Sequence, residues 1–329
     1  MLLIHGICST RGDRLVHQTM GPDEPIPAGA IWIDLLNPTT PEDAKVEQHL
    51  GISIPTREEM HDLEPSETIY AEDGAHYMTL RVICQSETNV PRLADVTFIL
   101  TEKALVTVRY DEPGAFNIFL NRVTKPGGCE LEPAGVIEGL IEAIVDRAAE
   151  VLRGVGDRID MRSRQIFDGN SASVEQGRVY QAVVRKIGQY EHIISNVRES
   201  MVSVERVLLY LSANFKRTKK AASGFTPEWR AAIRDVQAIE EHATFLSNKL
   251  QFMLNATLGL VSIEQNKIIK LFSVVAVVFM PPTLVASIYG MNFEKMPELK
   301  WQIGYPMSLG IMVVAAILPY LFFRWKKWL

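Results

Sequence analysis

The side chains best suited to binding chemistry gather in one short segment near the C-terminal end of the chain. Tyr289-Gly290-Met291-Asn292 lies between two apolar runs, and Glu294 and Glu298 follow it. Amide and carboxylate oxygens are ligands that hard cations bind. Because the segment joins two runs that are long enough to cross a bilayer, we expect the function to lie along the membrane-crossing axis.

The rest of the sequence carries no recognisable catalytic signature. The seven histidines show neither HxxxH nor HExxH spacing, and the chain has no GxSxG elbow or GxxxxGK[ST] phosphate loop. Gly154 and Gly156 lack the third glycine of a dinucleotide-binding turn. His61-Asp62 with Glu64 could mimic an acid–base site, but it fits a helix surface better. We therefore predict that the chain is not an enzyme and needs no organic cofactor.

Composition narrows the class further. The mean hydropathy of +0.05 is too low for a polytopic membrane protein, so the apolar excess must be local. The net charge of −5 argues against nucleic acid as a partner, because phosphate binding needs clustered lysine and arginine. Cys8, Cys84 and Cys129 are scattered and form no CxxC pair. This pattern fits a reducing cytosol without disulfides or a zinc site.

Two apolar runs, Ile268–Ile288 and Tyr305–Phe323, are predicted to cross the membrane. Each has about twenty residues, enough for ~30 Å of hydrocarbon. Tryptophan and tyrosine residues flank the second run, which makes a buried core hairpin a weak alternative. Basic residues adjoin the cytosolic ends of both runs, so the positive-inside rule puts both chain termini in the cytosol. These residues are Lys267, Lys270, Arg324, Lys326 and Lys327.

Residues 1–130 are predicted to form a cytosolic domain that mixes strands and helices. Helix starts are indicated at Thr40-Pro41-Glu42-Asp43 and by the capping box Thr56-Arg57-Glu58-Glu59. Branched apolar runs predict strands at Leu2–Ile7, Ile31–Leu36, Tyr77–Val82, Val96–Leu100 and Leu105–Tyr110. Asp111–Gly114 is typical of a turn, and Lys125–Gly128 of a linker.

Residues 131–266 show helical periodicity and are predicted to form a long helical stalk, which leaves residues 267–329 as the membrane domain. One helix starts near residue 134, and a second spans roughly Val174–Leu211. A third begins at Thr226-Pro227 and meets no strong breaker before Pro281, so we expect it to enter the membrane unbroken. The alternative is a hinge near Glu264-Gln265-Asn266.

One face of the first span differs from the rest, because it has polar ends and an apolar middle. Its residues at helical spacing are Asn266, Ile269, Phe272, Ala276, Met280, Thr283 and Ser287. A single helix cannot enclose a pore, but several copies with this stripe inward can. Thr283 and Ser287 could instead be small residues for helix packing.

The segment and its flanks resemble the CorA magnesium transporter family, in its enterobacterial-type branch. The resemblance rests on Tyr289–Phe293, Met296-Pro297-Glu298-Leu299, Ile263–Lys270 and Pro281–Ser287, and it is close over residues 260–329. It implies a homopentamer in the inner membrane. It also implies an α+β protein with an N-terminal α/β/α cytosolic domain, long coiled-coil-like stalk helices and two C-terminal transmembrane helices.

The resemblance also implies roles for individual residues. Gly290, Met291 and Asn292 would form a selectivity ring that meets a hydrated ion, and Glu294 and Glu298 would attract cations to it. Within the stripe, Phe272 and Met280 would be apolar constrictions and Asn266 a polar inner ring. Arg324, Lys326 and Lys327 would form a basic collar at the cytosolic exit.

The implied cargo is Mg²⁺, with Co²⁺ and Ni²⁺ also passing, and intracellular Mg²⁺ would close the pore. Candidate regulatory ligands are Asp34, Glu87 and Asp235, with Asp62, Glu64 and Glu67 as further acids. For each of them, a solvated surface charge is the favoured interpretation. The basic tip Lys216–Lys220 replaces acids found in some relatives, so its role stays open.

Three alternatives remain at this point. A ZntB-like zinc and proton transporter is the nearest, although Met291 and the intact Met296–Leu299 segment favour magnesium. A membrane-anchored cytosolic enzyme and an ion sensor that does not conduct are the others.

Overall fold

The computed structural model describes residues 1–8, 14–21, 24–64, 67–85, 91–123, 132–167, 173–214, 227–291, 297 and 301–326 of the chain. The chain separates into two compact units. Unit 1 comprises Met1–Asn170 and Gln181–Leu254, and unit 2 comprises Ser171–Tyr180 and Asn255–Leu329. The division into three domains near residues 130 and 266 stays a prediction.

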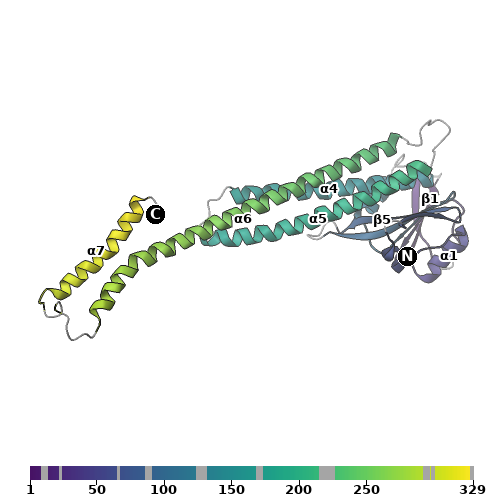
Figure 1. Cartoon of the computed structure of the whole chain (residues 1–329). Helices are drawn as coiled ribbons and strands as arrows, with labels where there is room; N and C mark the ends of the chain where they lie inside the picture. Colours follow the sequence, from purple (N-terminus) through teal and green to yellow (C-terminus); the bar gives the residue numbers. More distant parts are fainter. Residues whose placement is uncertain are drawn as a thin grey trace. The chain divides into compact units, whose positions relative to one another are not determined.

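A seven-stranded mixed sheet forms the centre of unit 1, in the order β2-β1-β3-β7-β6-β5-β4 (Figure 1). β3 and β7 pair in parallel, and the other neighbours are antiparallel. The strands are β1 (Leu2–Cys8), β2 (Arg14–Thr19), β3 (Ala30–Leu36), β4 (Ile69–Glu72), β5 (Ala75–Cys84), β6 (Arg92–Leu100) and β7 (Leu105–Arg109). The strands predicted from apolar runs are confirmed, while β2 and β4 were not predicted.

Helices cover both faces of this sheet. On one face, Val46 of α1 (Thr40–Leu50) and Met60 of α2 (Arg57–Asp62) pack into the same core as Ile33 and Val106 of the sheet. On the other face, the ring of Trp32 lies 5.5 Å from that of Phe119 in α3 (Gly114–Val123). Side chains alternate between the two faces of a strand, so neighbouring residues of β3 supply both cores. The expected α/β/α arrangement is confirmed.

The start of α2 forms as the capping box predicts. The carboxylate of Glu59 accepts a hydrogen bond from the backbone N–H of Thr56 at 2.7 Å, and the N–H of Glu59 donates to Thr56 Oγ1 at 3.3 Å. Such caps contribute about 0.5–2 kcal/mol and position the first turn. They fix the residue at which α2 begins.

Long helices complete unit 1. They are α4 (Pro133–Phe167), α5 (Ser173–Asn214) from Gln181 onward, and α6 (Pro227–Tyr289) as far as Leu254. Ser247 of α6 donates to Glu191 of α5 at 2.9 Å, and Lys249 of α6 pairs with Asp160 of α4. These contacts join the three helices, which lie side by side in Figure 1. The predicted long helices are confirmed.

α6 is one continuous helix of 63 residues, and the alternative of a hinge near Glu264 is wrong. The helix also continues through Pro281 and Pro282, although proline has no N–H to donate. Among the described residues, α6 and α7 (Gly304–Trp325) are long and apolar enough to cross a membrane. None of the apolar window of α6 is buried within one chain, and 6% of that of α7 is. The expected pair of C-terminal transmembrane helices is therefore confirmed.

Candidate functional site

The Gly290-Met291 segment closes the C-terminal end of α6. The N–H of Gly290 donates to the carbonyl oxygen of Ala286 at 2.9 Å, and that of Met291 to Ile288 at 3.3 Å. A Cβ atom on Gly290 would lie 3.1 Å from the Ala286 oxygen, which is tighter than ordinary contact. Glycine at this position therefore permits a close backbone approach, and it does so without a positive φ. The side chain of Met291 is 47% exposed.

Several of the predicted site residues lie outside the part of the chain that the structure describes. They are Asn292, Glu294, Glu298, Lys327, Glu87 and the basic tip 216–220. Their roles stay predictions.

The predicted stripe forms an exposed face on α6. At ~100° per residue, its members fall within an arc of about 120°, with Phe272 at the edge. Ile269, Phe272 and Met280 are 62%, 68% and 69% exposed in the single chain. Large apolar side chains this exposed need lipid or further protein to cover them. The structure thus brings the stripe together on one side of the helix, and the opposite side, with Leu271 63% exposed, is as open as the stripe in a single chain.

Two hydroxyl groups in the predicted membrane span of α6 are turned back onto the helix. Thr283 Oγ1 donates to the carbonyl oxygen of Phe279 at 2.7 Å. Ser273 Oγ donates to that of Ile269 at 2.9 Å. A hydroxyl whose hydrogen is used in this way presents oxygen lone pairs outward. Ser273 was not among the predicted residues, although its seven-residue spacing from Asn266 and Met280 could have revealed it.

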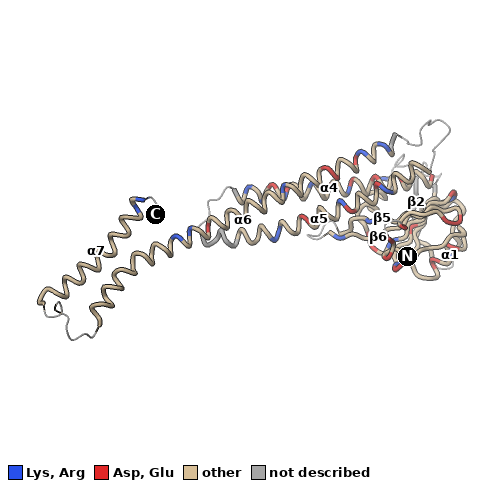
Figure 2. Tube along the Cα trace, viewed as in Figure 1, with Lys and Arg blue, Asp and Glu red and all other residues tan. Residues whose placement is uncertain are grey.

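Charged residues frame the apolar parts of unit 2. The sequence of α6 beyond Lys270 and of α7 before Arg324 contains no charged residue, and the tube in Figure 2 is tan over these parts. Arg324 and Lys326 are exposed at the end of α7, and Lys326 Nζ lies 5.4 Å from the ring centre of Trp325. A cation beside an interfacial tryptophan is typical of a helix end at a membrane surface.

Two of the predicted regulatory acids, Asp34 and Asp235, lie among the residues that the structure describes. Asp34 is fully buried and accepts hydrogen bonds from Arg109 Nη2 at 2.8 Å and from Thr107 Oγ1 at 2.7 Å. This arrangement favours a structural ion pair over a metal ligand. Asp235 is exposed on α6. Within the described ranges, no three His, Cys, Asp or Glu side chains are placed to hold a metal ion.

Comparison with known proteins gives consistent matches over nearly the whole chain. The family model "CorA-like Mg2+ transporter protein" matches residues 27–327. The magnesium transport protein CorA of Pasteurella multocida is 36% identical over 301 residues, covering 91% of this chain and 92% of the relative. The protein of that name from Escherichia coli K12 is 33% identical over 318 residues, covering 96% and 97%.

The fold has a solved counterpart as well. The complete structure of the CorA magnesium transporter from Methanocaldococcus jannaschii matches with a TM-score of 0.72, covering 100% of this chain and 99% of that one. Its sequence identity is 17%, so this likeness speaks to the fold alone.

Proposed function

Because the chain belongs to the CorA-like Mg²⁺ transporter family, we propose that it is a channel-like Mg²⁺ importer that also passes Co²⁺ and Ni²⁺. It is an inner-membrane protein with a cytosolic N-terminal domain. The observation that carries the proposal is the exposed stripe of α6, which ends at Gly290-Met291.

The stripe supports assembly of several copies around one axis. A lone helix satisfies its own backbone and cannot enclose water in a bilayer. If copies of α6 face one another through the stripe, polar groups at its two ends and apolar groups in its middle line a shared path. The homopentamer is the assembly that we carry over from the family.

The entrance of this path suits a hydrated ion. Mg²⁺ gives up water reluctantly and usually keeps several waters. Neutral amide oxygens from a ring of Asn292 side chains can accept hydrogen bonds from those waters without stripping them. A ring of carboxylates would hold the ion more tightly and release it more slowly, and conduction needs release. Glu294 and Glu298 then act outside the ring by attracting cations.

Below the entrance, the lone pairs of Thr283 continue the same chemistry. Coordinated water donates hydrogen bonds outward, so an oxygen that cannot donate is a matched partner. Met280 and Phe272 follow as apolar constrictions that close the path by dewetting. Asn266 forms the inner polar ring, and Arg324, Lys326 and Lys327 form a basic collar at the exit.

The driving force is the membrane potential. Moving one charge through 100 mV is worth ~2.3 kcal/mol, so a divalent ion gains about 4.6 kcal/mol on entry. Such influx needs no ATP. Intracellular Mg²⁺ closes the pore when the cytosol is replete, and the described acids do not identify where it binds.

The test is flux into liposomes that contain the purified protein. Entry should follow an inward Mg²⁺ gradient, stop with cobalt hexaammine, and be lost in Asn292→Ala while the variant still assembles. A membrane anchor for an enzyme, or a sensor without conduction, gives no flux in the parent protein. Zn²⁺ uptake that needs a proton gradient, with no Mg²⁺ entry, would favour a ZntB-like transporter and overturn the proposal.

A further inference from the structure

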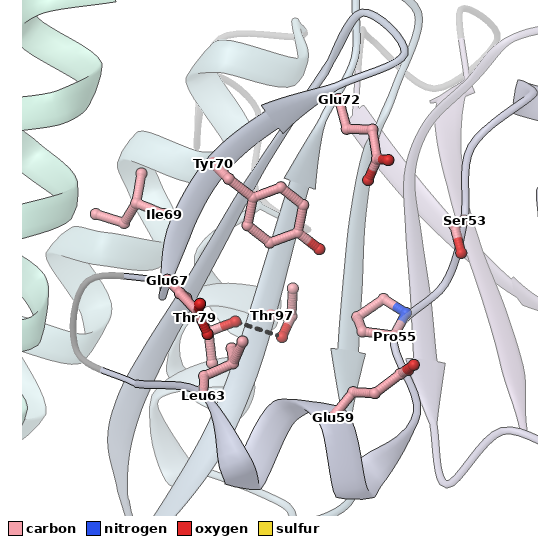
Figure 3. A pocket seen from close by; sticks show the side chains of 10 residues that line it. All are labelled: Ser53, Pro55, Glu59, Leu63, Glu67, Ile69, Tyr70, Glu72, Thr79 and Thr97. Carbon is pink, nitrogen blue, oxygen red and sulfur yellow. Dashed lines mark hydrogen bonds between the residues drawn. The ribbon is translucent and has the colours of Figure 1, made fainter.

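Unit 1 has a cleft of about 540 Å³ between α2, the chain that follows it, and the sheet. Figure 3 shows its lining side chains, which come from the 53–55 loop, α2, residues 63 and 67 after α2, β4, β5 and β6. They are Ser53, Pro55, Glu59, Leu63, Glu67, Ile69, Tyr70, Glu72, Thr79 and Thr97. The transport path uses none of these residues.

The walls of the cleft are built from fixed parts. The hydroxyl of Tyr77 accepts a hydrogen bond from the N–H of Ser53 at 3.2 Å and donates to its carbonyl oxygen at 3.0 Å. These bonds tie the 53–55 loop to β5. The ring of Tyr70 stacks on Tyr77 with centroids 4.6 Å apart and planes 5° apart. Because one face of Tyr70 is covered in this way, the ring is held as a wall.

The floor carries two buried hydroxyl groups. Thr79 and Thr97 are 7% and 1% exposed, and their Oγ1 atoms lie 2.9 Å apart. A hydrogen bond between two hydroxyls uses one of their two hydrogens. The pair therefore keeps a hydrogen and oxygen lone pairs for a group that enters the cleft, where both residues are part of the lining.

The charge of the cleft has one sign. Three of the described lining residues, Glu59, Glu67 and Glu72, are acidic, and none is basic. In Figure 3, Glu72 lies toward one end, Glu59 and Glu67 lie toward the other, and Tyr70 lies between them. Burial raises the pKa of Tyr70 to about 12, with further contributions from Tyr77, Glu72 and Glu59. An entering cation meets negative potential over the length of the cleft.

We propose that this cleft binds an aliphatic polyamine, with ammonium groups at the separated carboxylates and the methylene chain against Tyr70, Leu63 and Pro55. The separation of charges fits an elongated cation better than a compact one. The aromatic and aliphatic walls give methylene groups apolar contact, and the face of Tyr70 attracts an adjacent ammonium group. A bare metal ion fits less well, because no three acids among the described residues converge on one point.

The probe for the test is spermidine, titrated into the full-length protein in detergent and followed by calorimetry. Removing two partly exposed ion pairs should weaken binding about five- to tenfold, so Glu67→Gln with Glu72→Gln is the test variant. Its charge-matched control is Glu58→Gln with Glu102→Gln, which are exposed residues outside the cleft. Tyr70→Leu keeps the charge and should weaken binding about threefold through the lost ring face.

Each result decides the question. Equal losses in the control and test variants would mean unspecific charge attraction, and they would overturn the proposal. So would an absence of binding at millimolar spermidine, or Mg²⁺ binding that needs Glu67 and Glu72 and that spermidine does not displace. Thermal unfolding checks the fold of each variant, and the single variants replace the double one if it does not fold. None of these measurements depends on ion flux.

Discussion

Arg109 forms a buried ion pair with Asp34 inside unit 1, with Nε 3.0 Å from Oδ1 and Nη2 2.8 Å from Oδ2. The pair joins β7 to β3, which are parallel neighbours in the sheet. The guanidinium carbon of Arg109 also lies 4.6 Å from the ring centre of Phe116 in α3. One buried ion pair therefore connects the two strands to the helix that covers them.

Asp34→Ala should lower the free energy of unfolding by about 3–5 kcal/mol, because it leaves a buried guanidinium without its partner. Chemical denaturation of the protein in detergent measures this loss. Asp235→Ala, on an exposed part of α6, is the control and should change stability by less than about 0.5 kcal/mol. If Asp34 is instead a regulatory ligand, its variant keeps its stability and loses closure by Mg²⁺.

Thr283→Val should reduce Mg²⁺ flux in liposomes by about tenfold, the effect of roughly one lost hydrogen bond in the path. Valine keeps the shape of threonine and removes its outward lone pairs. Thr283→Ser keeps the hydroxyl and should conduct nearly as the parent does. Equal flux in the valine and serine variants would mean that Thr283 serves packing, as small residues in membrane helices often do.

Phe272→Ala combined with Met280→Ala should raise flux at high internal Mg²⁺. A wider, less apolar constriction should keep its water under conditions in which the constriction of the parent pore loses its water. Leu271→Ala is a matched control, because Leu271 is 63% exposed and lies on the opposite side of α6 from the stripe. A rise in the Leu271 variant of the same size would indicate general loosening of the helices.

Gly290→Ala should reduce flux without preventing membrane insertion. Its Cβ would lie 3.1 Å from the carbonyl oxygen of Ala286, so the last turn of α6 must shift by a few tenths of an ångström. A shift of a few tenths of an ångström should disturb the geometry of the selectivity filter more than it disturbs folding. Liposome flux and chemical denaturation, measured on the same preparation, separate the two effects, and an unfolded variant would contradict the expectation.

Asp43 predicts a pH dependence of stability in unit 1. Burial, with Glu47 and Glu42 nearby, raises the pKa of Asp43 from 3.8 to about 6. Between these two values the folded protein binds more protons than the unfolded chain, so stability falls as pH rises through this window. Asp43→Asn removes the titration. The stability of the variant relative to the parent should therefore increase from pH 4 to pH 7, as measured by denaturation at each pH.

Local signals predicted the elements that local chemistry builds. The capping box at Thr56 and Glu59 gave the start of α2, and the absence of strong breakers gave the unbroken α6. β2 contains Arg14, His17 and Gln18 and pairs only with β1, so it lacks an apolar run. β4 was missed because it is short and largely exposed, so it too lacks an apolar run. α3 was not predicted because it begins at Gly114, within residues Asp111–Gly114 that are typical of a turn.

Side-chain pairs between residues far apart in the chain could not be predicted from the sequence. Asp34 looked like a free carboxylate because Arg109, its partner, lies 75 residues away along the chain. The stripe on α6 was readable because helical spacing alone defines it, apart from Ser273. The proposed polyamine cleft combines residues from six segments, and none of those segments is distinctive by itself.

The two consecutive prolines in α6 have a mechanical consequence. Pro281 and Pro282 carry no amide hydrogen, so the carbonyl oxygens of Val277 and Val278 lose the donors that a regular helix would give them. Two consecutive backbone hydrogen bonds of the helix are thus missing, over about half a turn just before Thr283. A helix bends most easily where its hydrogen bonds are missing. The part of α6 that carries Gly290 can therefore tilt at Pro281-Pro282 while the turns on either side keep their bonds.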